Sequence, residues 1–142
     1  MDKKEIQDVT RAYFKSIGFQ VLKKTKFYYE SGDYFLTVVM LHSNFSKTYY
    51  IDYWISLKDL HDWKNTALTD LEVDAQGRFG DTEYAFETEY EKVNPDVYLK
   101  VLEKQSKRHI EPIMKYGLTA IAKNSYLDIF DLNVEKYLGK IK

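Results

Sequence analysis

Residues 26–58 read KFYYESGDYFLTVVMLHSNFSKTYYIDYWISLK and decide the fold. Val, Ile, Thr, Tyr, Phe and Trp dominate this stretch, and such side chains favour the pleated, partly buried surface of a sheet. Gly32 lies in a polar triplet between two strand-like runs, which predicts a hairpin turn. A second polar break, at 44–47, precedes the last run. We therefore predict two or three long antiparallel strands, which the rest of the chain covers.

The last of these runs, Thr48 to Lys58, has two faces of different chemistry. Alternate residues point to opposite sides of a strand, and one side is apolar and predicted to be core: Tyr49, Ile51, Tyr53, Ile55 and Leu57. The other side mixes aromatic and polar groups: Tyr50, Asp52, Trp54 and Ser56. This second face is either buried beneath a helix or exposed. If it is exposed, Tyr50, Asp52 and Trp54 are candidate binding residues, because Tyr and Trp are enriched in binding hot spots.

A helix is predicted before these strands. Asp2 is a suitable N-cap for a helix from Lys3 to Ile17, and Gly18 is typical of the residue that ends one. Apolar residues at three- and four-residue spacing predict its buried stripe: Ile6, Val9, Tyr13 and Ile17, with Phe14 beside them. Residues Phe19 to Lys24 predict a short first strand.

Further helices are predicted at the C-terminal end. Asn94 and Pro95 form a typical helix start, and Pro112 predicts a break near residues 108–111 in the long helix that follows. The second limb of this helix is expected to reach Lys123. Ser125 and Asp128 have the spacing of a capping box for a last helix. Its predicted buried face consists of Leu127, Phe130, Val134 and Leu138.

The segment between strands and helices is less regular and more acidic. Residues 59–69 predict either a short helix or an irregular excursion, and Gln76-Gly77 predicts a turn. The alternation over Glu83 to Tyr90 predicts an amphipathic strand with an acidic outer side that includes Glu83, Glu87 and Glu89. These glutamates, and the acidic segment from Asp70 to Glu91 that contains them, are the candidate docking surface for a basic protein partner, since complementary charge selects partners. The alternative is an ordinary solvated face.

The order of the predicted elements is helix, strands, then helices. Segregated runs of this kind are typical of the α+β class. We predict one domain, residues 1–142, with an antiparallel sheet of four to five strands and C-terminal helices packed on one sheet face. The scarcity of Gly and Pro, 6 and 2 residues, leaves no linker that would divide the chain.

Composition excludes several classes of function. The chain has no Cys, which excludes disulfides and thiolate chemistry. A net charge of −1 argues against nucleic-acid binding by bulk charge. The N-terminal MDKKEIQDV has no apolar run behind it, and no segment approaches the roughly 20 apolar residues that span a bilayer. We therefore expect a cytoplasmic protein that does not bind a membrane.

No pattern in the sequence carries a specific chemistry. The three histidines, His42, His61 and His109, are far apart and lack metal-binding spacing. A nucleophile elbow and a phosphate-binding glycine loop are both missing from the sequence. We therefore predict no catalytic residue, no metal and no cofactor, and enzyme activity stays unsupported.

Four short segments resemble a known family. They are Phe14-Lys15-Ser16-Ile17-Gly18-Phe19, Phe27-Tyr28, Leu41-His42-Ser43 and Tyr49-Tyr50-Ile51-Asp52-Tyr53. In these, over residues 5–57, the chain resembles the bacterial family called domain of unknown function 4304. The resemblance implies a small bacterial α+β domain. The family brings no established activity, cofactor or site residues to carry over.

Two functional hypotheses follow, with a third, structural one. The leading hypothesis is a non-enzymatic protein-binding module, for example an immunity-type protein that neutralises a basic toxin through the open sheet face and the acidic strand. The alternative is a small-molecule-binding or enzymatic domain with a pocket between the sheet and the long helix. Trp54, Asp52 and His42 would line that pocket. Homodimerisation through an exposed sheet face is the third option.

Overall fold

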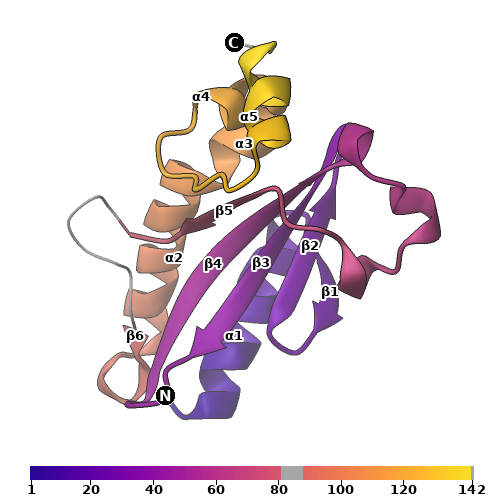
Figure 1. Ribbon diagram of the computed structural model, residues 1–142. Helices are drawn as coiled ribbons and strands as arrows, with labels where there is room; N and C mark the ends of the chain where they lie inside the picture. The colour runs from indigo at the N-terminus through magenta and orange to yellow at the C-terminus, as the bar shows by residue number, and fades with distance from the viewer. Residues whose placement is uncertain (81–87, 142) are drawn as a thin grey trace.

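The computed structural model describes residues 1–80 and 88–141, with the side chain of residue 88 left out (Figure 1). The helices are α1 (Lys3–Ser16), α2 (Pro95–His109), α3 (Glu111–Tyr116), α4 (Leu118–Lys123) and α5 (Leu132–Gly139). The strands are β1 (Gln20–Lys23), β2 (Lys26–Glu30), β3 (Tyr34–His42), β4 (Thr48–Leu57), β5 (Ala75–Arg78) and β6 (Thr88–Glu89). Short 3₁₀ turns lie at Lys58–Leu60, Trp63–Asn65, Leu68–Asp70 and Tyr90–Lys92.

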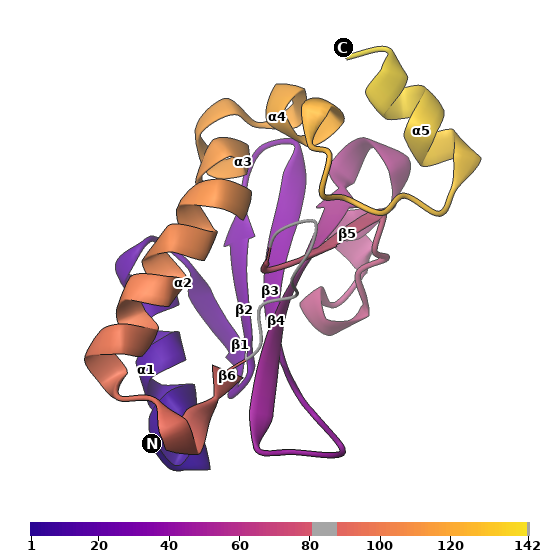
Figure 2. The ribbon, with the colours of Figure 1, turned by 90° about the vertical axis from the view of Figure 1, so that its left-hand side faces the viewer.

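The strands form one antiparallel sheet, which confirms the predicted α+β class. Their order is β1-β2-β3-β4-β5, and β6 also pairs with β4. The central pairing joins β3 to β4 through nine consecutive residue pairs, from Tyr34 opposite Leu57 to His42 opposite Tyr49. Helices α1 and α2 lie together on one face of this sheet (Figure 2).

The predicted core face of β4 is confirmed. All five of its apolar residues are at most 2% exposed, and they belong to the core cluster that includes residues of α1 and α2 such as Phe14 and Leu102. The buried stripe of α1 differs from the prediction, because Ile6, Thr10 and Phe14 are buried whereas Val9, Tyr13 and Ile17 are only partly so. Thr10 can be buried because its hydroxyl bonds the Ile6 carbonyl and the Tyr98 hydroxyl, each at 2.7 Å.

Local capping signals behave as predicted at both long helices. The Asp2 carboxylate accepts a hydrogen bond from the Glu5 amide at 2.8 Å, and the Asn94 side chain accepts one from the Val97 amide at 2.9 Å. Such caps satisfy the free amides of the first helical turn. Helix α1 is followed by Gly18, whose positive φ of 105° suits a residue without Cβ.

The C-terminal helices are partly as predicted. The long helix ends at His109, and Pro112 lies in the first turn of α3, as expected. Gly117, with φ of 64°, divides the predicted second limb into α3 and α4. The predicted capping box at Ser125 is wrong, since α5 begins at Leu132 and Asp131 caps it.

Residues 125–131 form an irregular segment because the backbone of Asp128 pairs with the edge of the sheet. Its backbone exchanges two hydrogen bonds with Gln76 of β5, at 3.0 and 2.7 Å. Val134 and Leu138 are buried as predicted, but Phe130 is 80% exposed. Pairing with β5 therefore overrides the local capping signal.

The predicted turn at Gln76-Gly77 is also wrong, because both residues belong to β5, which pairs with β4. Gly77 lies opposite Tyr53, whose ring covers it. A Cβ at residue 77 would lie 2.2 Å from Cζ of Tyr53. The glycine is thus required by a close approach inside the sheet.

Only the end of the predicted acidic strand can be compared with the structure. Thr88–Glu89 forms β6, which pairs with Thr48 and Tyr49 of β4, and Tyr90 is buried. The remaining residues, including Glu83 and Glu87, lie outside the described residues.

A polar network crosses the core between β4 and α2. The fully buried His109 contacts the Tyr53 hydroxyl through Nδ1 at 2.9 Å and the Gly80 carbonyl through Nε2 at 2.6 Å. Because a carbonyl only accepts, Nε2 carries the proton and Nδ1 accepts from Tyr53. Burial lowers the pKa of His109, which favours this neutral form.

Replacing Gly77 with Ala should lower the free energy of unfolding by about 1–3 kcal/mol, because the Tyr53 ring must shift within a packed core. Urea unfolding measures this loss. Gly32→Ala is the matched control, since no atom lies within 4 Å of the added Cβ there. Equal stabilities of the two variants would contradict the assigned close contact.

Stability should fall as the pH drops below 6.5, the ordinary pKa of histidine. Above that pH residue 109 is neutral in both folded and unfolded chains. Below it the unfolded chain binds a proton that the folded chain excludes, until the lower folded pKa is reached. The contribution is at most about 1.4 kcal/mol per pH unit.

The comparison is urea unfolding of wild type and His109→Gln at pH 5 to 8. The variant should lose this part of the pH dependence, since its amide does not titrate in that range. Parallel curves for the two proteins would show that His109 titrates alike in both states.

Candidate functional site

The predicted binding residues Tyr50, Asp52 and Trp54 share the second sheet face, opposite α1 and α2. Asp52 is only 1% exposed and bonds the Arg78 guanidinium, with Nε to Oδ1 at 2.6 Å. Gln76 donates a further bond to it at 3.2 Å. The carboxylate of Asp52 is therefore already paired within the chain.

Cations of the chain itself lie over the two aromatic rings of this face. The Arg78 guanidinium is 4.9 Å from the centroid of the Tyr50 ring, and the Lys26 ammonium is 5.2 Å from that of Trp54. Both contacts are of the cation–π type. A partner that stacks on either ring would have to displace these cations, and a binding role for this face stays a prediction.

The described carboxylates near β6 have cationic partners. Glu89 contacts Lys92 and Glu91 contacts Lys47, each at 2.6 Å. These are exposed pairs, which contribute little stability but reduce the local negative charge. The acidic strand as a docking surface therefore also stays a prediction.

A segment that the sequence left ambiguous covers part of the second sheet face. We call residues 58–74 the covering segment. It lies on the side of the sheet opposite α1 and α2 (Figure 2). The Trp63 ring packs edge-on against Phe35 of β3, with ring centroids 5.7 Å apart, and Ser56 of β4 bonds the Glu72 carbonyl at 2.6 Å. The face is thus partly buried, beneath 3₁₀ turns, which corresponds to neither of the two alternatives left open by the sequence, burial beneath a helix or full exposure.

Lys58 anchors the start of the covering segment. Its ammonium contacts the Glu30 carboxylate at 2.7 Å and lies 4.8 and 4.1 Å from the ring centroids of Phe35 and Trp63. The residue is 8% exposed. A carboxylate and two aromatic faces together compensate for the water that this buried cation loses.

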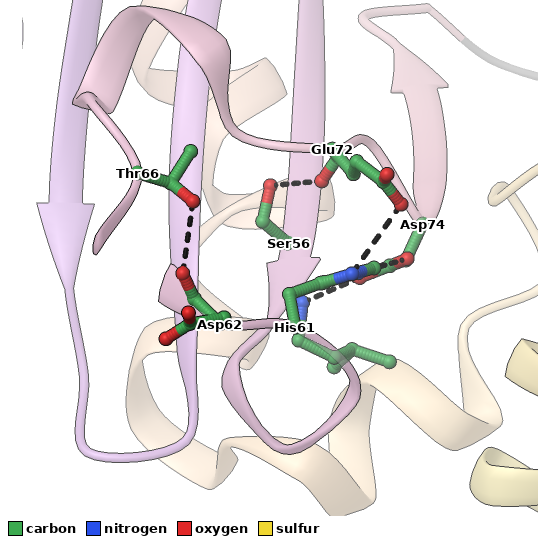
Figure 3. Close-up of polar contacts among 7 residues, drawn as sticks. Ser56, His61, Asp62, Thr66, Glu72 and Asp74 are labelled. Atoms are coloured by element: carbon green, nitrogen blue, oxygen red, sulfur yellow. Dashed lines mark hydrogen bonds and ion pairs between the residues drawn. The ribbon is translucent and has the colours of Figure 1, made fainter. Parts of the chain in front are cut away.

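His61, directly after the first 3₁₀ turn, anchors the start of the covering segment to its end (Figure 3). Its Nε2 lies 2.7 Å from Oδ1 of Asp74, and its Nδ1 lies 3.3 Å from the Glu72 carboxylate. Asp74 is buried and also accepts the Leu57 amide at 2.6 Å. His61 therefore joins the first 3₁₀ turn to the residues that enter β5.

The contacts of this cluster hold the covering segment in place. Both ring nitrogens of His61 contact carboxylates, so neither is left free as the nitrogen of a general base is. Among the described residues, no group of three His, Asp or Glu side chains is arranged to hold a metal ion. His42 and His109 have other partners, the Tyr90 hydroxyl and Gly80 respectively.

Several hollows open on the surface of the described residues. One of about 320 Å³ lies on the covering segment itself, and one of about 690 Å³ lies between that segment and α5. A larger one, about 1010 Å³, lies between α1 and α2. The predicted pocket lining is wrong in part, because Asp52 and Trp54 lie on the sheet face opposite α2.

Comparison of the chain with known protein families, with curated proteins and with solved structures found no match. The resemblance to domain of unknown function 4304 therefore stays a prediction. Within the described ranges, no helix combines the length and the apolar character needed to cross a membrane.

His61→Ala should destabilise the chain by about 1–3 kcal/mol, because the buried Asp74 carboxylate loses a partner. Urea unfolding measures the total loss, and limited proteolysis should show earlier cleavage within residues 58–74. Asn65→Ala is the matched control, since it removes only two exposed side-chain bonds to Asp62. Equal stability and equal cleavage of the two variants would show that His61 does not hold the covering segment in place.

Proposed function

We propose that this chain is a non-enzymatic protein-binding module that binds a basic partner through the covering segment. The observation that carries the proposal is the small hollow on that segment. Its apolar lining includes Leu60, Trp63 and Leu71, and its carboxylates are those of Asp62, Asp70 and Glu72. Lys and Arg bury the apolar stem of the side chain against apolar surface and keep the charged group at its end in a polar environment. A basic side chain of a partner fits both halves of this lining.

The charge of the covering segment supports the same partner. Four of its carboxylate residues are exposed: Asp59, Asp62, Asp70 and Glu72. Lys64 is exposed in the same segment, whereas Lys58 is buried against Glu30. An excess of negative charge speeds the encounter with a basic partner and disfavours acidic ones.

The anchors of the segment matter for affinity. A loop that is already ordered loses less conformational entropy when it binds. Lys58 and His61 supply this order through the contacts with Glu30 and Asp74. An immunity-type protein that neutralises a basic toxin is one concrete form of such a module. The proposed docking surface is distinct in sequence from the predicted acidic strand, of which the structure describes only the end, at β6.

Reversing charge on the covering segment should weaken partner binding at least tenfold, since two attractive contacts become repulsive. The experiment is affinity capture from a lysate of the native host with three baits: wild type, Asp62→Lys/Asp70→Lys and Glu89→Lys/Glu91→Lys. Bound proteins are identified by mass spectrometry, and their affinities are then measured with purified partner. Thermal melting confirms that each bait is folded.

The proposal expects a basic partner that wild type and the Glu89/Glu91 variant retain and the Asp62/Asp70 variant loses. Loss from the Glu89/Glu91 variant alone would move the docking surface to the acidic strand. A partner that all three baits bind equally would contradict both locations.

A further inference from the structure

The hollow of about 1010 Å³ between α1 and α2 is an open groove on the outer side of the helices. Helices α1 and α2 run side by side from the same end of the sheet, and no described element lies outside them (Figures 1 and 2). The groove floor is mostly apolar and partly buried: Val9, Tyr13, Ile17, Tyr29, Leu99 and Met114. We call it the helical groove.

One wall of the helical groove carries charges in strict alternation. We call Glu103, Lys107, Glu111 and Lys115 the charged ridge; all four line the groove and are exposed. Helical hydrogen bonds continue across the junction of α2 and α3, from the Ile110 amide to Ser106 and from the Met114 amide to Ile110. The four-residue spacing therefore keeps these side chains on one side of a helical path about 18 Å long.

The charged ridge has no ionic partner within the described part of the chain. No ion pair there includes Glu103, Lys107, Glu111 or Lys115. The opposite wall of the groove is small and uncharged, with Ala12 and Ser16. A partner that covers the groove would therefore meet all four charges from one side.

We propose that a second copy of this chain covers the helical groove, in a two-fold dimer that pairs the two charged ridges antiparallel. In a two-fold interface every contact occurs twice. If one residue of the first copy contacts a given residue of the second, the same two residues also meet with the copies exchanged. Antiparallel alignment places Glu103 opposite the second copy's Lys115 and Lys107 opposite its Glu111. All four contacts across the axis then join opposite charges.

The alternation also excludes competing arrangements. A parallel alignment would place Glu103 against the second copy's Glu103 and every other charge against its equal. An antiparallel alignment shifted by four residues would place Glu103 against Glu111. Like charges opposite one another are repulsive, so the ridge disfavours both the parallel alignment and the four-residue shift.

Apolar contacts would supply the affinity of this dimer. Paired charges at the rim of an interface set specificity, whereas buried apolar and aromatic side chains supply most of the binding energy. The two groove floors would face each other beside the paired ridges. Tyr116, 62% exposed at the end of α3, adds an aromatic side chain next to Lys115. This surface is separate from the covering segment, so the dimer and the proposed partner binding are tested independently.

The test uses two charge variants of the full chain. Glu103→Lys/Glu111→Lys makes the ridge wholly basic, and Lys107→Glu/Lys115→Glu makes it wholly acidic. Sedimentation velocity should find wild type as a dimer, each variant as a monomer with at least tenfold weaker self-association, and an equimolar mixture of the two variants as a dimer. The rescued mixture also shows that both variants are folded.

The matched control is Lys104→Glu/Lys123→Glu, which reverses two exposed charges that do not line the groove and should leave the dimer intact. A wild-type chain that stays monomeric at concentrations up to about 1 mM would overturn the proposal. Its dissociation constant would then exceed about 1 mM, which corresponds to less than about 4 kcal/mol of standard free energy of dimerisation. A dimer that persists in both charge variants would also overturn it. So would a monomer that binds the apolar dye anilinonaphthalene sulfonate at Tyr13 and Met114, because the groove would then belong to a small ligand.

Discussion

The pairing of β3 with β4 is the constraint on which the rest of the structure depends. Nine consecutive residue pairs fix the register of these two strands. Because side chains alternate, this register decides which of them meet the helices and which meet the covering segment. A slip by one residue would turn Tyr53 away from α2 and bring Trp54 into the core. Both the helical groove and the covering segment are thus placed by one pairing at the centre of the sheet.

The two faces of the sheet are closed by different means. The apolar face lies beneath α1 and α2 and is held by burial of aliphatic and aromatic side chains such as Phe14 and Phe27. The mixed face is closed over part of its area by an irregular segment that depends on paired polar groups, Lys58 with Glu30 and His61 with Asp74. Such a segment keeps many carboxylates at the surface while its backbone stays ordered. This difference is why the proposed docking surface lies on the covering segment.

Local signals in the sequence predict the parts of the fold that depend on neighbours in the chain. The caps at Asp2 and Asn94 and the two faces of β4 are of this kind, and the structure confirms them. Distant contacts explain the errors. Gly77 lies in a strand because the Tyr53 ring covers it, and the backbone of Asp128 pairs with Gln76 instead of entering a helix. The covering segment shows no periodic spacing of apolar residues, because pairs of polar side chains hold it in place. Its role could therefore not be predicted from the sequence.

Hydrogen–deuterium exchange of the wild-type chain tests the central claim, that the covering segment is an ordered surface and not a loose loop. Its backbone amides at His61, Thr66 and Asp70 donate to carbonyls within the 3₁₀ turns, and the Asp74 amide donates to Ile55 of β4. These amides should exchange much more slowly than those of an unstructured chain, with Asp74 as slow as its neighbours in the sheet. Exchange at unprotected rates throughout residues 58–74 would contradict that claim.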